Sequence, residues 1–349
     1  MQRITRAVVA IVLLVLVAGG CKKHRSPSEP LRLGAFPNVT HAQALVGNAD
    51  GTLERYAGPG GVEVKLFNAG PAAMEALLSG SIDAAYVGTG PAVNAYLKGG
   101  RELRVIASAS DGGAMLVTRS ARTPEALRGK KIAVPQAGNT QDIALRYWLR
   151  QHNLKVGKGG VEVVSVANPE VVSLFARGEI EGAWVPEPWG TRMLAEGGYV
   201  LVDERDLWPG RRFPTTLLVT TTRALKERRP QLEALMRAHV ELTRRWQADP
   251  EAFARQLNDG FEKATTRRLD EAVVRDAFTR LGPDLYPSQR ALEIAAAHAQ
   301  AVGYLRDADV SGMIDFSVLE AVEGARAPPA ATDPHQRTQP GREGDRGRE

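Results

Sequence analysis

Two stretches of this chain repeat one pattern of a strand, a loop, a helix and a second strand. The first reads GVEVKLFNAGPAAMEALLSGSIDAAYV over residues 61–87, and the second reads GVEVVSVANPEVVSLFARGEIEGAWV over residues 160–185. With a one-residue gap the copies share a proline before the helix, a glycine at its end and an acidic residue before the second strand: Pro71 and Pro169, Gly80 and Gly178, Asp83 and Glu181. Two such copies predict two similar α/β lobes. Lobes that face each other enclose a cleft, and clefts bind ligands.

The composition is typical of a soluble globular protein with room for two domains. The 349 residues are 43% hydrophobic and 24% charged, with a net charge of +5. The arginines are scattered and partly concentrated at the chain ends, so nucleic acid is not indicated as a partner. The six histidines show no metal-ligand spacing, and the sequence has neither a G-x-S-x-G elbow nor a G-x-x-x-x-G-K-[ST] run. We therefore expect no enzyme activity, no cofactor and no metal.

The beginning of the chain has the pattern of a signal peptide. Arg3 and Arg6 precede an apolar run over residues 7–18, and two glycines follow this run. A charged start, a short apolar segment and small residues before a cleavage point are the features of a secretory signal. The run is too short for a comfortable transmembrane helix. We predict a signal peptide over residues 1–20.

Cys21 is the only cysteine of the chain, so no intramolecular disulfide can form. Its place directly after the small residues resembles a bacterial lipobox, although Ala18 stands where such motifs usually carry Leu, Val or Ile. We expect the Cys21 thiol to carry a lipid that anchors the protein to a membrane, with residues 21–30 as a lipidated polar tether. A plain cleaved signal and an uncleaved anchor are the alternatives.

The organisation between the ends predicts a discontinuous first lobe and a continuous second lobe. An Asp-Gly-Gly sequence at residues 111–113 is expected to be a flexible break at the first crossing, and the return is expected near residues 213–216. The first lobe would then hold residues 31–111 and 213–325, and the second would hold residues 112–212.

Helical spacing of apolar residues predicts four helices packed on the first lobe, over residues 230–248, 250–258, 269–281 and 288–302. Residues 326–349 are rich in proline, glycine and charge, with no aliphatic residue larger than alanine. Such a composition cannot bury a core, and it predicts a disordered tail.

Four motifs resemble those of the periplasmic solute-binding proteins of ABC importers. They read LRLGAFPNVTHAQALVG, ALLSGSIDAAYVGTGPAV, SARTPEALRGKKIAVPQAGNTQDIALRYWL and GEIEGAWVPEPWG. The resemblance is to the nitrate, sulfonate, taurine and bicarbonate group, which also includes binders of thiamine precursors, and it covers about residues 21–325. It implies an α/β, two-lobe periplasmic-binding-protein type II fold with two hinge crossovers. It also implies a membrane permease, and through it an ATPase, as partners.

The ligand of a doubly wound sheet lies beyond the carboxyl ends of the strands. Four segments take that place, at residues 37–41, 88–91, 138–141 and 186–189. Two of them lead into helices, whose free N–H groups and positive dipole ends stabilise an anion. We predict ligand contacts from Asn38, Thr40, His41, Thr89, Gly90, Ser108, Asn139, Thr140, Gln141, Glu187 and Trp189.

Each of these residues also has a purely structural interpretation. Hydroxyl and amide side chains at helix starts can simply cap the helix. Glu187 could bind the amino group of a zwitterion, or it could accept N–H groups of its own loop or contact the other lobe. Trp189 could wall the pocket or pack beneath it. The four segments contain no Lys or Arg. This favours an organic anion held by backbone dipoles and hydroxyls over a hydrated inorganic ion.

The predicted function is that of an extracytoplasmic, monomeric solute-binding lipoprotein of an ABC importer. It would capture a small organic anion, an aliphatic sulfonate or taurine before others, and hinge closure of the lobes would enclose it. The alternatives are a ligand-sensing or scaffolding lipoprotein on the same fold, and a thiamine-precursor binding or biosynthetic protein.

Overall fold

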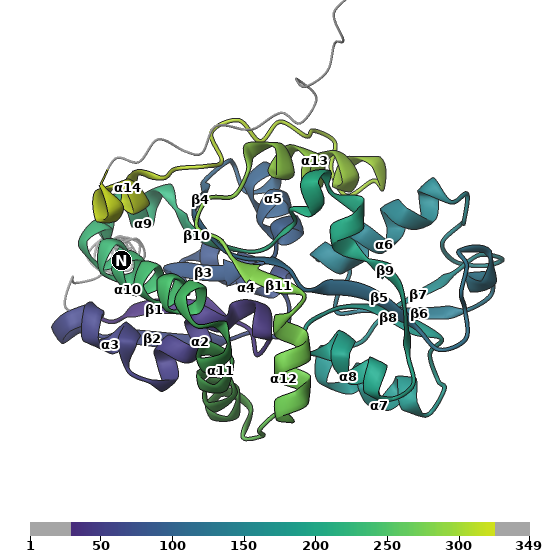
Figure 1. Ribbon diagram of the computed structural model, residues 1–349. Coiled ribbons are helices and arrows are strands. Elements are labelled where there is room, and N and C mark those ends of the chain that lie inside the picture. Colours follow the sequence, from purple (N-terminus) through teal and green to yellow (C-terminus); the bar gives the residue numbers. More distant parts are fainter. Residues whose placement is uncertain (1–28, 325–349) are drawn as a thin grey trace, which may run out of the picture.

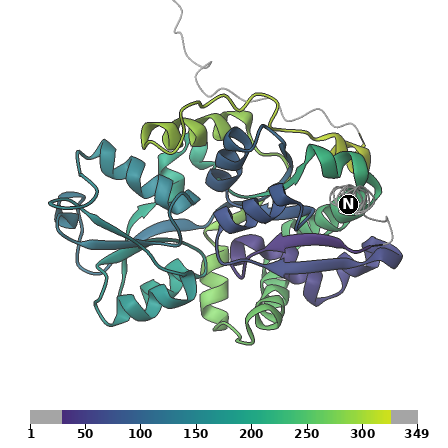
Figure 2. The same ribbon diagram turned by 180° about the vertical axis from the view of Figure 1, so that it is seen from behind.

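The computed structural model describes residues 29–324 and consists of two α/β lobes that lie side by side (Figure 1). The predictions for the signal peptide, for Cys21 and for residues 326–349 lie outside the described residues. We call the six-stranded sheet with its helices the first lobe, and the five-stranded sheet with its helices the second lobe. Seen from behind, the two sheets again occupy opposite ends of the molecule (Figure 2).

The sheet of the first lobe has the strand order β11-β4-β10-β3-β1-β2. β1 is parallel to both β2 and β3, while β10 is antiparallel to β3 and β4, and β11 is antiparallel to β4. The strands are β1 Leu31–Ala35, β2 Val62–Leu66, β3 Ala84–Val87, β4 Leu103–Gly112, β10 Pro214–Thr221 and β11 Leu281–Pro283.

The sheet of the second lobe has the strand order β7-β6-β8-β5-β9. β6 is parallel to β7 and β8, and β5 is antiparallel to β8 and β9. The strands are β5 Ala114–Thr118, β6 Lys131–Val134, β7 Glu162–Ser165, β8 Gly182–Pro186 and β9 Tyr199–Asp203.

The repeat in the sequence folds into the same unit in both lobes. The first copy forms β2, helix α4 (Gly70–Ser79) and β3, and the second forms β7, helix α7 (Asn168–Ala176) and β8. In each sheet a further parallel strand, β1 or β6, lies between the two strands of the copy. The predicted fold class, a two-lobe α/β fold, is confirmed.

Two crossings connect the lobes. The chain leaves β4 at Gly112 and enters β5 at Ala114, so Gly113 alone separates the two strands. Gly113 has a φ of 75°, and a Cβ atom there would lie 2.5 Å from Leu281 Cδ2. The left-handed backbone conformation favours glycine at this position. The return crossing runs from β9 to β10 through the short 3-10 helices η4 (Glu204–Leu207) and η5 (Pro209–Arg211). We retain the lobe limits given above as a proposal.

Two predictions near the first crossing are wrong. Asp111 and Gly112 do not form a flexible break, because they belong to β4 and pair with Gly282 and Leu281 of β11. The helix expected over residues 269–281 ends earlier, as α12 (Glu271–Phe278), and Leu281 begins a strand. The edge of β4 offers backbone partners to this segment, and a local apolar spacing does not reveal such a long-range pairing.

Helices cover the sheets and also connect the lobes. α10 packs on α2, α3 and α14, α11 packs on α2 and α12, and α13 and α12 reach across to α6 and α8 of the second lobe. The remaining bounds are η1 Val39–His41, α2 Ala42–Ala49, α3 Thr52–Ala57, η2 Gly58–Gly60, α5 Thr89–Lys98, η3 Glu125–Leu127, α6 Thr140–Gln151, α8 Trp189–Ala195, α9 Thr222–Glu227, α10 Arg229–Ala248, α11 Pro250–Thr265, α13 Gln289–Ala301 and α14 Ser317–Glu323. Over residues 29–324, no helix is both long and apolar enough to cross a membrane.

The return crossing begins with a buried acid. Glu204 is 1% exposed, and one of its carboxyl oxygens accepts a hydrogen bond of 2.7 Å from Trp184 Nε1 while the other has no partner. Burial raises the pKa of Glu204 to about 8. The carboxyl group therefore stays protonated in the folded protein at pH values where it is ionised in the unfolded chain.

Replacing Glu204 with glutamine will remove a pH dependence of stability. Because the folded pKa is raised, Glu204 favours folding most below its ordinary pKa, and this contribution is lost as the pH rises toward about 8. Between about pH 5 and about pH 8, the melting temperature of the wild type should fall relative to that of Glu204→Gln. Parallel curves of melting temperature against pH for the two proteins would contradict this prediction.

Candidate functional site

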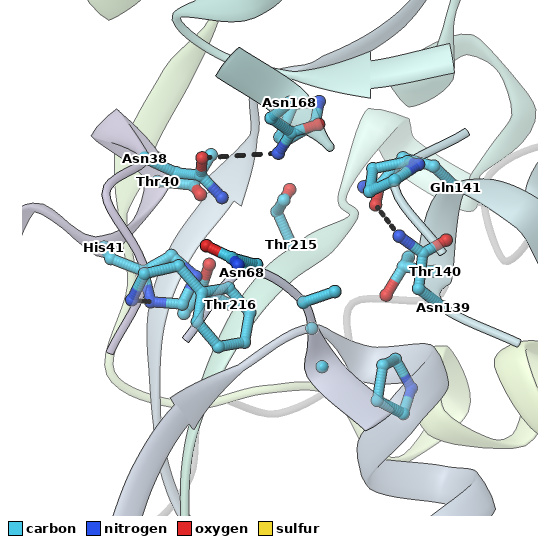
Figure 3. Close-up of a pocket in the computed structure, with 17 residues that line it drawn as sticks. Asn38, Thr40, His41, Asn68, Asn139, Thr140, Gln141, Asn168, Thr215 and Thr216 are labelled. Carbon is cyan, nitrogen blue, oxygen red and sulfur yellow. Dashed lines mark hydrogen bonds between the residues drawn. The ribbon is translucent and has the colours of Figure 1, made fainter. Parts of the chain in front are cut away.

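A small cavity lies between the lobes, at the carboxyl ends of the parallel strands of both sheets (Figure 3). The volume of the cavity, counted as the space open to the centres of water molecules, is about 30 Å³. One water requires ~10–15 Å³ on the same measure. The loops after β1, β2 and β3 line it from the first lobe, those after β6 and β7 and the end of β8 line it from the second, and β10 adds two threonines. The lining residues are Phe36, Asn38, Thr40, His41, Asn68, Ala69, Gly70, Gly88, Pro91, Pro135, Asn139, Thr140, Gln141, Asn168, Pro186, Thr215 and Thr216.

Four helices begin at this cavity. Their starts are the lining residues Gly70 of α4, Gly88 before α5, Thr140 of α6 and Asn168 of α7. No side chain caps α4, α5 or α7, whereas Asn139 caps α6 by accepting the Asp142 N–H. The first N–H groups of a helix lack partners within it, and the helix dipole adds partial positive charge there. Two helices from each lobe therefore make the cavity attractive to an anion.

The lining contains no Asp, Glu, Lys or Arg among the residues that the structure describes. His41 is neutral there, because burial lowers its pKa to about 3. Its Nδ1 accepts the Phe36 N–H at 3.3 Å, so Nε2 carries the ring proton and serves as a donor. Amides, hydroxyls and one neutral imidazole make up the polar lining.

The carboxylates nearest to these loops in the sequence are already bound. Asp142 accepts hydrogen bonds from Gly138 N–H at 2.8 Å, from Arg146 Nε at 2.7 Å and from the Tyr304 hydroxyl. Glu187 is fully buried and accepts both the N–H (3.0 Å) and the hydroxyl (2.9 Å) of Thr191. Neither lines the cavity. Within residues 29–324, no group of three His, Cys, Asp or Glu side chains could hold a metal ion.

A chain of side chains fixes the orientation of two lining amides. Trp189 Nε1 donates to Asn38 Oδ1 at 2.8 Å. An indole N–H can only donate, so the oxygen of Asn38 must face it. The same oxygen accepts a long hydrogen bond of 3.5 Å from Asn168 Nδ2 of the second lobe (Figure 3). Asn168 Oδ1 is consequently turned away from Asn38, and it has no hydrogen-bond partner.

Direct hydrogen bonds also connect the lobes beside the cavity. Gly90 N–H donates to Thr140 Oγ1 at 3.2 Å, and Asn94 Nδ2 donates to the Gly138 carbonyl at 3.1 Å. A Cβ atom on Gly90 would lie 2.9 Å from Thr140 Cα. The lobes are therefore in close contact, and this contact depends on the absence of a side chain at residue 90.

The chain matches the model of the NMT1-like family over residues 24–258, which is more than half of its length. The protein belongs to the NMT1-like family. This confirms the resemblance on which the sequence predictions draw.

This NMT1-like protein is similar to a curated relative and to two solved structures. The taurine-binding periplasmic protein of Escherichia coli K12 is 28% identical over 267 residues, which are 74% of this chain and 80% of the relative. The alkanesulfonate-binding protein of Xanthomonas axonopodis pv. citri, solved with MOPS bound, matches with a TM-score of 0.69 and 20% identity over 82% of this chain and 99% of the neighbour. The nitrate-binding protein of Synechocystis PCC 6803 matches with a TM-score of 0.65 and 17% identity over 84% and 88%. At these identities the two structural likenesses are of fold alone.

Six of the eleven predicted ligand-binding residues line the cavity of this NMT1-like protein. Figure 3 shows Asn38, Thr40 and His41 on one side and Asn139, Thr140 and Gln141 on the other. The two groups follow β1 and β6, which hold equivalent places in the two sheets.

The other five predicted residues do not line this cavity. The Thr89 hydroxyl donates to the Pro214 carbonyl, and with Gly90 it borders a second, smaller cavity that shares Thr140 with the first. Ser108 is fully buried within β4. Glu187 takes its structural alternative by binding Thr191. Trp189 is buried beneath the lining, where it holds Asn38 and packs on Phe261.

Sequence reasoning missed four polar lining residues. Asn68 and Asn168 follow β2 and β7, so they lie in corresponding loops of the two repeat copies. Comparing those loops with the predicted site would have revealed them. Thr215 and Thr216 belong to β10, whose register against β4 shifts on both sides of Thr216. This irregular long-range pairing has no local signal in the sequence.

Proposed function

We propose that this NMT1-like protein is the extracytoplasmic solute-binding component of an ABC importer and that it captures a small organic anion of the sulfonate class. The observation that carries the proposal is the cavity itself, where four helix starts converge and no Asp, Glu, Lys or Arg side chain is among the described lining residues. Backbone dipoles hold an anion without a fixed cation. The taurine-binding and alkanesulfonate-binding relatives make a sulfonate the first candidate.

The mechanism is closure of the lobes around the ligand. Each lobe supplies two helix starts, so an anion in the cavity interacts with both and favours the closed form over the open one. Gly113 and the segment from η4 to Phe213 connect the lobes, and backbone rotation there would open the cleft. The closed form would then dock on the permease and release the ligand through it.

The test is calorimetric titration of the full chain, purified in mild detergent, with small sulfonates, nitrate, bicarbonate and acetate. We expect at least one sulfonate to bind with a dissociation constant of about 10 μM or lower and to raise the melting temperature, because a ligand that binds only the folded state stabilises it. Absence of binding by every sulfonate, with the protein folded by circular dichroism, would contradict the proposal.

We also propose that a lipid on Cys21 holds the protein at a bacterial membrane. A cysteine directly after the small residues of a signal segment supports this. Cys21→Ser should therefore move the protein from the membrane fraction to the soluble fraction of cells, and metabolic labelling with a fatty-acid analogue should disappear. A processed Cys21→Ser protein that stays with the membrane would argue against the anchor.

A further inference from the structure

Two buried oxygen atoms of the cavity lining have no hydrogen-bond partner. They are Asn168 Oδ1 of the second lobe and Thr216 Oγ1 of the first, in residues that are 5% and 1% exposed. Buried polar atoms in folded proteins are nearly always paired. Both residues line the same cavity, so a ligand held between the lobes can supply partners to them.

Asn168 Oδ1 is a free hydrogen-bond acceptor, so its partner on the ligand must be a donor. Its nitrogen faces Asn38 Oδ1, which is itself fixed by the donor-only indole of Trp189. An amide oxygen accepts hydrogen bonds and never donates them. The ligand therefore carries a hydrogen-bond donor in addition to its anionic end.

That donor is not a cation. An ammonium group buried here would have no carboxylate beside it, since the described lining has none and Asp142 and Glu187 are bound elsewhere. Taking a charge out of water without a counter-charge is strongly unfavourable. The positive ends of four helix dipoles at the same cavity add to this repulsion.

We infer that the cavity selects a compact hydroxysulfonate, an anion whose second polar group is a neutral hydroxyl, over an aminosulfonate such as taurine. The inference rests on the proposed function and narrows its substrate class. The sulfonate accepts hydrogen bonds from the N–H groups of the helix starts, and the hydroxyl donates to Asn168 Oδ1. The space of about 30 Å³ for water centres corresponds to about two or three waters and therefore favours a small ligand.

The test compares three sulfonates of nearly equal size on the full chain in mild detergent at neutral pH. They are 2-hydroxyethanesulfonate, ethanesulfonate and taurine, which differ only in a hydroxyl, a hydrogen or an ammonium group. We expect 2-hydroxyethanesulfonate to bind at least about tenfold more tightly than taurine, with ethanesulfonate between them. Taurine binding as tight as 2-hydroxyethanesulfonate, or tighter, overturns the inference and leaves the proposed function standing. If none of the three sulfonates binds and no larger sulfonate binds either, both the inference and the proposed function are overturned. If only a larger sulfonate binds, the inference alone is overturned.

A matched pair of variants tests whether Asn168 recognises the hydroxyl group of the ligand. Asn168→Asp puts a carboxylate at the unpaired oxygen and should shift the ratio of taurine to 2-hydroxyethanesulfonate affinity by about tenfold toward taurine. Asn153→Asp makes the same chemical change at an exposed position after α6 and should leave the ratio unchanged. An unchanged ratio in folded Asn168→Asp overturns the inference.

If Asn168→Asp does not fold, Asn168→Ala serves instead. It removes the unpaired oxygen that accepts the hydroxyl of the ligand. The preference for 2-hydroxyethanesulfonate over ethanesulfonate should then shrink toward equality, and a preference equal to that of the wild type overturns the inference.

Discussion

Gly90→Ala will weaken ligand binding by about tenfold or more without unfolding the protein. A Cβ atom at this residue would lie 2.9 Å from Thr140 Cα and 3.1 Å from Ile143 Cδ1, both in the second lobe. Backbone cannot yield as a flexible side-chain end can, so the lobes have to separate. The same substitution favours helix α5 itself, because alanine is a better helix former than glycine by up to about 1 kcal/mol.

Two measurements separate these effects. Titration with the tightest-binding sulfonate should show the loss of affinity, and small-angle scattering of the free protein should show a larger radius of gyration. Gly282→Ala is the matched control, since a Cβ atom there would meet no atom within 4 Å, and its affinity should equal that of the wild type. Wild-type affinity in Gly90→Ala would mean that this contact between the lobes does not limit closure.

Asp83→Ala will lower the free energy of unfolding by about 3–5 kcal/mol. The Asp83 carboxylate accepts hydrogen bonds from Arg32 Nε (3.0 Å), Nη2 (2.7 Å) and backbone N–H (2.9 Å), and each residue is 8% exposed. Removing the carboxylate leaves the buried guanidinium without its counter-charge. Denaturation by urea should show the loss, while Glu179→Ala, which removes an exposed partner of Arg177, should change stability by less than about 1 kcal/mol.

The stability that the Asp83–Arg32 pair contributes also depends on pH. Burial by itself raises the pKa of Asp83, but the hydrogen bonds and charge of Arg32 outweigh it and hold the pKa below its ordinary value. The contribution is therefore full above the ordinary carboxyl range and is lost as the pH falls through the lowered pKa. A wild-type protein no more stable than Asp83→Ala at neutral pH would contradict both statements.

The acidic residue shared by the two repeat copies has the same kind of role in each lobe. Asp83 ties the start of β3 to Arg32 on β1. Glu181, its counterpart before β8, accepts the N–H groups of Ser120 and Ala121 after β5, each at 2.7 Å. The sequence places these acids correctly between helix and strand, because a glycine stop and an apolar strand are local signals. Their partners lie 51 and about 60 residues away, and only folding reveals them.

The candidate site also depends partly on local sequence patterns and partly on contacts with distant segments. Thr89 and Thr140 both follow a strand and both begin a helix, so the sequence treats them alike. The structure turns the Thr89 hydroxyl to the Pro214 carbonyl and leaves Thr140 at the cavity. β10 arrives beside Thr89 from a segment 125 residues away, and no pattern around residue 89 indicates it.

The sequence by itself determined the two α/β lobes, their repeated unit and the helix starts that follow β3 and β6. Those features depend on residue spacing, on glycine and proline stops and on backbone groups that every helix start exposes. The tertiary structure alone decided that Glu187 and Trp189 turn beneath the lining, that Asn168 meets Asn38 across the lobes, and that residues 281–283 form a strand. Each of these depends on which distant segment arrives as the neighbour, and neighbours are set by packing of the whole chain.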